Sequence, residues 1–352
     1  MASSPARRRM RVYALTRQRR PRWISEAAVT SFTWVFSSSI VLVAVALAAS
    51  PAAQDRVRVS IVKNRSEGPA VMERGLADRL RTLGCDVART STVQLTPDED
   101  RQYGAWNKAA LESRHLNQLV SQAGNSDLVI GLLTNCSDLL GMLAGLQRPA
   151  AAPAAPGAVG LAGTKPRRVG LVWIDAHADF NTPETTLSGM LGGMPVAIAA
   201  GMCLTRHRLV TGLDPALPTK YIVMAGLRDV DPLEQELLDR SDCEMISVED
   251  IRRLTANVGD QIGRLARLTD VIYVHIDMDV LDPREVMAHG NKVPGGPSSE
   301  DLAALFEAIF TRYRKASAIG FATIPPTDEG GLSIAALNRM IAAAVRGVAS
   351  RK

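Results

Sequence analysis

An apolar run that turns abruptly acidic is the feature that most constrains this chain. Residues 169–174 read VGLVWI and carry no charge, which predicts a strand buried on both faces of a parallel sheet. The next five residues read DAHAD. Because alternate residues of an extended segment point to the same side, Asp175, His177 and Asp179 are expected to converge where the strand ends. Open α/β sheets bind their ligands at this end of the strands.

A second strand-like segment, residues 273–276, ends in the same way. Asp277 and Asp279 follow it, again two residues apart. Crowded carboxylates and an imidazole repel one another and lose hydration unless a cation joins them. Their oxygen and imidazole donors suit hard or borderline divalent ions such as Mn²⁺. The number of donors favours a pair of ions bridged by Asp175 and Asp277. For the first segment alone, the alternative is a polar turn in which His177 is hydrogen-bonded.

Three segments together resemble the arginase/agmatinase (ureohydrolase) family. They are DAHADFNTPETTLSG from residue 175, HIDMDVLDP from residue 275 and GLRDVDPLE from residue 226, and the resemblance covers most of residues 57–350. It implies a dinuclear manganese hydrolase that releases urea and an amine from a small guanidino compound. In that family a hydroxide shared by two metal ions attacks the guanidinium carbon. The resemblance also implies a homo-oligomer, either a trimer or a hexamer.

The resemblance implies a role for each residue of the two acidic motifs. Asp175 and Asp277 would bridge the metals, and Asp179 would also orient the hydroxide. The other expected ligands are Asp179 and Cys136 for the first ion, and His177 and Asp279 for the second. Asp179, His177 and Asp279 are therefore the expected catalytic residues.

The expected substrate contacts also follow from the resemblance. Asn181 and Ser188 match positions that hold an α-carboxylate, and Asp231 matches the position that meets an α-amino group. Together they favour an amino-acid-like guanidino substrate over agmatine, which has no carboxylate. The alternative is that Asn181 and Ser188 serve only turn and helix-cap roles, and that Asp231 is a turn residue.

Three positions depart from the family pattern. Cys136 stands roughly where a His ligates the first ion, and its softer thiolate opens the site to Zn²⁺ or Ni²⁺. The alternative is that Cys136 is a buried apolar residue at a strand end and no ligand. Gly192 replaces a His linked to proton transfer, and Ala322 stands where a Glu clasps the guanidinium. The candidate replacements are Asp328 or Glu329 for the carboxylate, and His275 or His289 for the imidazole. These departures leave two alternatives open: a catalytically weakened metal-binding relative, and an amide deacetylase on the same scaffold.

Alternating strand-like and helix-like segments extend over residues 56–352. The alternation predicts an α/β fold, a three-layer α/β/α sandwich with a central mostly parallel sheet, which forms one catalytic domain. Residues 148–168 are rich in Ala, Pro and Gly and predict a flexible loop. Strands are expected at 56–62, from 85, and at 128–133, 169–174, 221–225, 244–248, 271–276 and 316–321. Helices are expected at 69–83, 106–123, 139–146, 195–202, 232–240, 248–254, 261–268, 298–310 and 334–348.

Residues 1–55 resemble a leader. Eight Arg and one acidic residue give residues 1–53 a charge of +7, so the net charge of +5 leaves the remainder near −2. The residues after the leader are therefore nearly neutral and give no indication of nucleic-acid binding. Residues 27–54 are uncharged, as in an export signal or a membrane anchor. The alternative is a wrongly assigned start codon. We expect a cytoplasmic protein, or an exported or membrane-anchored one if the leader is real.

Overall fold

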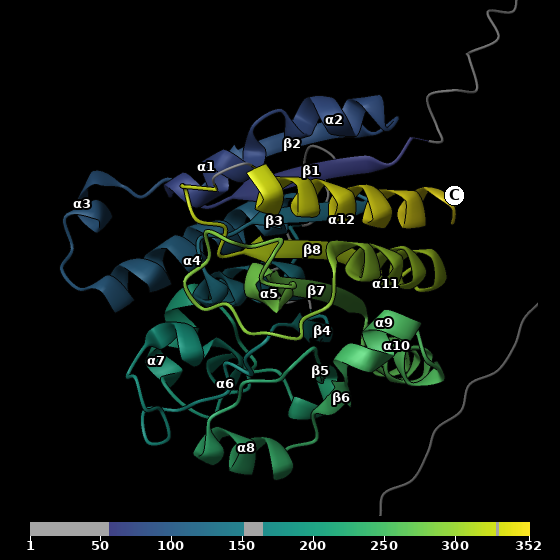
Figure 1. The fold of residues 1–352 in the computed structure, drawn as a ribbon. Coiled ribbons are helices and arrows are strands. Elements are labelled where there is room, and N and C mark those ends of the chain that lie inside the picture. Colours follow the sequence, from purple (N-terminus) through teal and green to yellow (C-terminus); the bar gives the residue numbers. More distant parts are fainter. Residues whose placement is uncertain (1–55, 151–164, 329–330) are drawn as a thin grey trace, which may run out of the picture. The chain divides into compact units, whose positions relative to one another are not determined.

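Eight strands in one sheet organise the chain in a computed structural model, which describes residues 56–150, 165–328 and 331–352. The expected leader and most of the Ala/Pro/Gly loop lie outside the described residues. Every strand pairing is parallel, and the order is β2-β1-β3-β8-β7-β4-β5-β6, from top to bottom in Figure 1. The strands are β1 (Arg58–Lys63), β2 (Asp86–Thr92), β3 (Leu128–Leu132), β4 (Val169–Ile174), β5 (Ile222–Ala225), β6 (Glu244–Ile246), β7 (Val271–Asp277) and β8 (Ala316–Ala322).

Helices cover both faces of this sheet, which confirms the expected three-layer α/β/α fold. Alternation along β4 shows the two cores: Val172 and Ile174 pack into one, and Leu171 and Trp173 into the other. The first core is covered by α1 (Glu67–Glu73), α2 (Leu76–Thr82), α9 (Val248–Arg253), α10 (Ala256–Leu268), α11 (Ser299–Arg312) and α12 (Leu332–Ala349). The second is covered by α4 (Ala105–Gln122), α5 (Leu139–Gln147), α6 (Pro195–Ala199) and α8 (Pro232–Asp239), with α7 (Thr205–Thr211) packed on α4.

The helix expected over residues 69–83 is in fact two helices, α1 and α2. Gly75 separates them in a left-handed conformation with φ of 65°, which only glycine adopts readily. A further short helix, α3 (Pro97–Asp100), was not expected. It begins with a capping box in which Thr96 and Glu99 satisfy each other's backbone amides.

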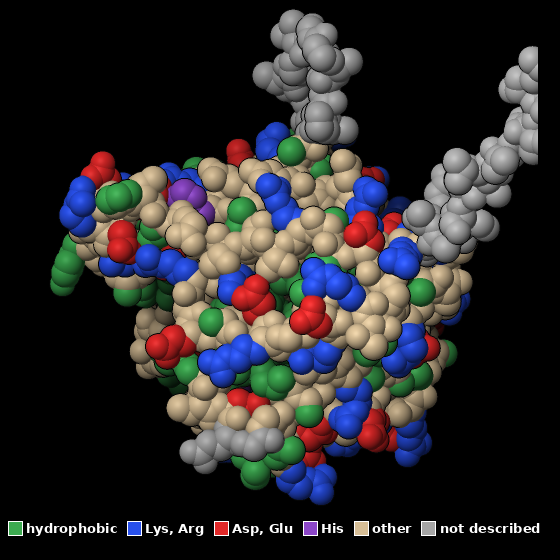
Figure 2. Space-filling view, turned by 90° about the horizontal axis from the view of Figure 1, so that it is seen from above, with side chains coloured by type: hydrophobic (Ala, Val, Ile, Leu, Met, Phe, Trp, Pro, Cys, Tyr) green, Lys and Arg blue, Asp and Glu red, His purple; other side chains and the backbone are tan. Residues whose placement is uncertain are grey.

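One described helix, α12, is long and apolar enough to cross a membrane by length and composition alone. It is 56% buried and packs against α11, as the core helix of a globular domain does. On the face of the molecule shown in Figure 2, basic and acidic side chains are interspersed over the described residues.

Candidate metal centre

Four neighbouring strands, β3, β8, β7 and β4, position the residues of the site at their carboxyl ends. The two acidic motifs come from β4 and β7. Ile174 of β4 pairs with Ile276 of β7, so Asp175 and Asp277 follow at the same level. Cys136 begins the short 3-10 helix η2 (Cys136–Asp138) that follows β3. Thr323 follows β8 directly. Residues distant in sequence therefore meet at the carboxyl ends of the central strands, where such sheets bind ligands.

The two acidic motifs fold locally in the same way. Asp175 accepts a hydrogen bond from the amide of His177 at 2.8 Å, and Asp277 accepts one from the amide of Asp279 at 2.9 Å. Each Asp therefore tightens its own turn, as Asp side chains commonly do. Ala176 and Ala178 are fully buried, so the polar residues that alternate with them point into the cavity.

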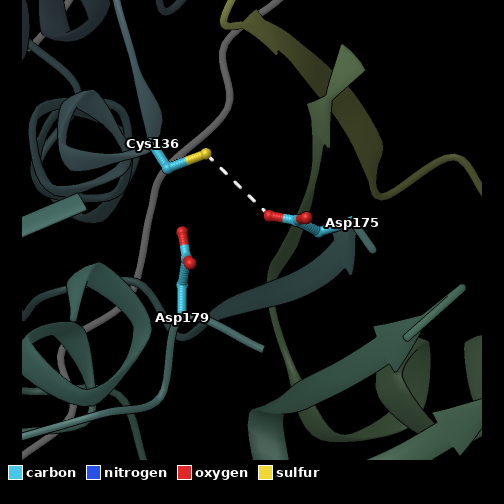
Figure 3. A group of neighbouring side chains, drawn as sticks. All are labelled: Cys136, Asp175 and Asp179. Atoms are coloured by element: carbon cyan, nitrogen blue, oxygen red, sulfur yellow. Dashed lines mark hydrogen bonds between the residues drawn. The ribbon is translucent and has the colours of Figure 1, made fainter. Parts of the chain in front are cut away.

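The structure brings all six expected metal ligands together around one cavity of about 260 Å³. The Cys136 Sγ lies 3.0 Å from Asp277 Oδ2 and 4.0 Å from Asp175 Oδ2. Figure 3 shows Cys136, Asp175 and Asp179 directed toward one another. The His177 Nδ1 lies 3.4 Å from Asp175 Oδ1 and 3.3 Å from Asp279 Oδ2.

Three groups of potential ligands overlap in this region, and within each the donor atoms lie within 4.8 Å of one another. Asp175 is grouped with Cys136 and Asp179, and also with His177 and Asp279. Asp279 is in addition grouped with Asp277 and His289. A shared carboxylate can bridge two cations, so the arrangement accommodates more than one ion. The groups are Cys136 with Asp175 and Asp179, Asp175 with His177 and Asp279, and Asp277 with Asp279 and His289.

Burial and mutual repulsion perturb the ionisation of these groups. Burial, reinforced by neighbouring carboxylates, raises the pKa of Asp175 and Asp179 well above the usual range and that of Asp277 to about 6. Burial also opposes ionisation of Asp279, but contact with His177 outweighs it and lowers the pKa of Asp279. Contact with Asp175 and then Asp279 raises the pKa of His177 to about 11.

The residues fit a pair of divalent cations. All four carboxylates are at most 9% exposed, and the Oδ1 atom of Asp279 has no hydrogen-bond partner among the described residues. Buried charge of one sign is costly unless a cation or a hydrogen-bond donor compensates it. Oxygen and imidazole donors suit Mn²⁺, whereas the Cys136 thiol adds a softer ligand.

The expected substrate residues also line the cavity. Asn181 is buried and donates to Asp231 Oδ2 at 3.0 Å, while Ser188 lies at the exposed rim. Local roles accompany these positions: Ser188 Oγ accepts the amide of Met190 at 3.2 Å, and Asp231 precedes α8. Ser188 and Asp231 therefore line the cavity and also make local turn or helix-end contacts.

The departures from the family pattern lie in different environments. Gly192 lines the cavity. Ala322 does not: it is fully buried at the end of β8, and the next residue, Thr323, lines the cavity and donates to Asp277. Thr323 has a positive φ of 65°, an uncommon conformation for a residue with a branched side chain. The expectation that Ala322 occupies the position facing the substrate was therefore wrong by one residue.

The candidate replacement residues also differ in how near they lie to the potential metal ligands. Asp328 caps α12 by accepting the amides of Ser333 and Ile334, and Glu329 lies outside the described residues. His275 is fully buried, stacked on Trp173 with centroids 4.4 Å apart. Only His289, among these imidazoles, joins a group of potential metal ligands.

Several residues at the cavity were not identified from the sequence. Glu234 lies within the third motif segment, and its Oε1 accepts the amide of Phe180 at 2.6 Å, which positions the residue after Asp179. Asn291 and Thr323 belong to no motif, and no sequence signal marks them as cavity residues.

Comparisons with known proteins place the chain in one family and one fold. The family model described as "Arginase family" matches residues 152–345. Arginase from Entamoeba histolytica is 32% identical over 270 residues, covering 75% of this chain and 86% of that protein. Human mitochondrial arginase-2 is 31% identical over 295 residues, covering 75% and 73%. The structure of arginase from Bacillus cereus has a TM-score of 0.69 at 21% identity, covering 82% of this chain and 98% of that one. Formimidoylglutamase from Bacillus subtilis has a TM-score of 0.62 at 14% identity, covering 84% and 88%, and shows the same fold.

Proposed function

The chain belongs to the arginase family, and from that premise we propose that it hydrolyses the guanidino group of a small, amino-acid-like compound. As a member of the family it is a hydrolase of linear amidine carbon–nitrogen bonds. The products would be urea and an amine. The observation that carries the proposal is the meeting of both acidic motifs around one cavity.

Two divalent cations are part of this proposal. Asp175 and Asp277 would bridge them, with Asp179 and Cys136 on the first ion, and His177 and Asp279 on the second. When bound, the cations would lower the pKa of a water shared between them and supply hydroxide near neutral pH. We expect Mn²⁺ as the physiological metal, with Zn²⁺ or Ni²⁺ as alternatives because of the Cys136 thiol.

The chain's own residues would orient the reactants. Asp179 is buried and held at a positive φ of 49°, which fixes its carboxylate to accept a proton from the attacking oxygen. Asn181 and Ser188 would donate hydrogen bonds to the substrate carboxylate, and Asp231 would accept one from its amino group. Oxygen adds to the guanidinium carbon, the bond to the substituted nitrogen breaks, and that nitrogen takes up a proton to leave as the amine. Gly192 has no side chain to provide this proton, so water in the cavity would deliver it.

A second candidate function is a metal-binding relative with little turnover. It is favoured by Cys136 and Gly192, which remove two imidazoles expected from the family resemblance. The two functions share the metal centre and differ only in the amount of urea released.

A urea assay on the full chain tests the proposal. The purified protein, loaded separately with Mn²⁺, Ni²⁺ and Zn²⁺, is incubated with arginine, its homologues and agmatine. We expect urea from a substrate that carries an α-carboxylate and an α-amino group. Asp277→Ala should reduce the rate by more than about 100-fold, because loss of a mere partner of a metal ligand already costs 10–100-fold.

Asp282→Asn is the matched control, since Asp282 lies in the same loop but pairs with Arg284 outside the cavity. It should retain activity. No urea from any substrate with any of the three metals would contradict the proposal and favour the second candidate. Equal urea release by Asp277→Ala would show that the acidic motifs are not the active site.

A further inference from the structure

We propose that His289 is a metal ligand, which the loop after β7 supplies to the ion held by Asp277 and Asp279. The inference rests on the proposed function, since it assumes that the acidic motifs hold divalent cations. His289 belongs to neither acidic motif. It lies in the segment between β7 and α11, whereas Cys136 follows β3.

The spacing of His289 from the carboxylates fits a shared cation. Its Nε2 lies 3.8 Å from Asp277 Oδ1, and donor atoms of His289, Asp277 and Asp279 lie within 4.8 Å of one another. A separation of 3.8 Å is too long for a hydrogen bond. It lies within the range of about 3.0–4.2 Å that is open to two atoms each about 2.1 Å from one metal ion.

Unsatisfied atoms in the same place point to the same conclusion. His289 is only 9% exposed, yet neither ring nitrogen has a hydrogen-bond partner among the described residues. The Oδ1 atom of Asp279, 2% exposed, also has none. Buried polar groups are rarely left unpaired, because each one costs about 1–3 kcal/mol. A cation between the imidazole and the two carboxylates would satisfy one ring nitrogen of His289 and the Asp279 oxygen, and would leave the other ring nitrogen as an N–H donor.

The loop that carries His289 is held against the site. The amide of His289 donates to the carbonyl of Val286 at 2.9 Å, and Val286 is fully buried. Arg228 donates to the carbonyls of Asp279, Val293 and Pro294, at 3.2, 2.9 and 3.0 Å. The guanidinium therefore ties both ends of the segment that contains His289 to the loop after β5. A ligand on a fixed loop needs little reorganisation to bind a metal.

The position of His289 favours metal ligation over proton transfer to the leaving amine. His289 does not line the cavity that holds the substrate residues. It lines a neighbouring pocket that shares Thr323 with that cavity. An imidazole that protonates the amine would have to reach the substrate cavity, whereas a ligand has to reach only Asp277 and Asp279.

The test combines metal binding with spectroscopy on the full chain. Mn²⁺ affinity and stoichiometry are measured by titration calorimetry for the wild type, His289→Ala and His289→Gln. His207→Ala is the control, because His207 on α7 also has an unpartnered ring nitrogen but does not line the cavity. In the Co²⁺-loaded protein, each coordinated imidazole gives a strongly shifted, exchangeable N–H proton resonance in the NMR spectrum.

We expect both His289 variants to lose at least about 10–100-fold in Mn²⁺ affinity for one ion, and to lose one shifted resonance. His177→Ala should lose a different resonance, and His207→Ala none. Unchanged affinity together with an unchanged set of resonances in His289→Gln would overturn the inference while leaving the proposed function intact. A wild type that binds no metal would overturn both, and circular dichroism identifies any variant that has failed to fold.

Discussion

At the scale of single residues, a buried thiol distinguishes the site. Cys136 is 3% exposed and lies 3.0 Å from Asp277 Oδ2. Burial, together with the neighbouring carboxylates, raises the pKa of this thiol well above its ordinary value. A thiolate there requires a cation beside it, and a thiolate selects softer metals than an imidazole does.

The identity of residue 136 should therefore set the metal preference. Cys136→His is expected to raise Mn²⁺ affinity relative to Zn²⁺ by roughly 10–100-fold, the range seen when the surroundings of a metal are altered. Titration calorimetry with each metal measures the ratio. The wild type loaded with Co²⁺ should also show a thiolate charge-transfer absorption band that the variant lacks. Cys203→His, outside the site, should leave the ratio unchanged, and an equal change in both variants would contradict the assignment of Cys136.

Gly192 offers a second test at this scale. A Cβ atom built at Gly192 meets no described atom within 4 Å, so a larger side chain can enter the cavity. Gly192→His is expected to raise kcat by about 100-fold or more, because a positioned proton donor contributes 10²–10⁴-fold. The pH–rate profile should gain an ionisation near the ordinary imidazole pKa of about 6.5.

Gly193→His is the control, because Gly193 also lines the cavity with open space around its Cβ. An equal gain in kcat in both variants would mean that an imidazole at either position can donate the proton. No gain in Gly192→His would mean that proton transfer does not limit the rate.

The sequence indicated the six proposed ligands, but it marked neither Thr323 as a cavity residue nor His289 as a ligand. Asp175, His177 and Asp179 could be placed because alternation along an extended segment is a local property. Thr323 could not, because its side chain enters the cavity through a positive φ that no propensity indicates. The sequence identified His289 only as a candidate replacement for a missing imidazole, because its approach to Asp277 depends on the path of a long loop.

At the scale of elements, β4 and β7 bring paired side chains together at both of their ends. The Asp175 and Asp277 pair lies at their carboxyl ends, and an ion pair between Arg168 and Asp270 lies at the opposite ends. Arg168 donates its amide, Nε and Nη2 to Asp270 at 2.8, 3.1 and 2.6 Å. These bonds, led by the side-chain hydrogen bond, lower the pKa of Asp270 to about 2. The pair therefore helps to hold the two strands in the register that aligns the acidic motifs.

This ion pair should make a small, pH-dependent contribution to stability. The pKa of Asp270 is lower in the fold than the unfolded value of about 3.9, so its stabilisation is present above pH 4 and fades as the pH falls toward 2. Asp270→Asn should lower the free energy of unfolding at pH 7 by less than about 1 kcal/mol, since both side chains are substantially exposed. Urea denaturation at pH 7 and pH 3 measures the difference, which should shrink at pH 3. Asp260→Asn, at an exposed position of α10, controls for loss of a surface charge, and a constant difference would contradict the assignment.

Elements with strong periodicity were predictable, whereas their boundaries were not. The eight strands were all expected, most of them because they are short apolar or alternating runs between turn residues, whereas only the start of the polar strand β2 was indicated. The break at Gly75 was missed because the apolar spacing of α1 and α2 continues across it. The beginning of α10 at Ala256, before the expected Gln261, reflects packing of Val258 into the core.

At the scale of the whole molecule, metal binding should stabilise the fold. The proposed ligands lie at the ends of three different strands, β3, β4 and β7, so a bound cation would cross-link the central sheet and bind only the native state. At a free Mn²⁺ concentration 100 times Kd, the gain is about 2.7 kcal/mol. We expect Tm to rise by several degrees when Mn²⁺ is added to chelator-treated protein, measured by circular dichroism. Asp277→Ala should show no such rise, and a wild type with the same Tm in chelator and in Mn²⁺ would contradict the prediction.

The sheet order also has a consequence for how the chain is made. β7 and β8 come last along the sequence but lie between β3 and β4. A growing chain would therefore carry two separate three-stranded ribbons, β2-β1-β3 and β4-β5-β6, each with a bare apolar inner edge, until β7 and β8 in the C-terminal quarter leave the ribosome. Such edges invite pairing with other chains, so this interval is when the nascent protein is most prone to aggregate and most in need of a chaperone.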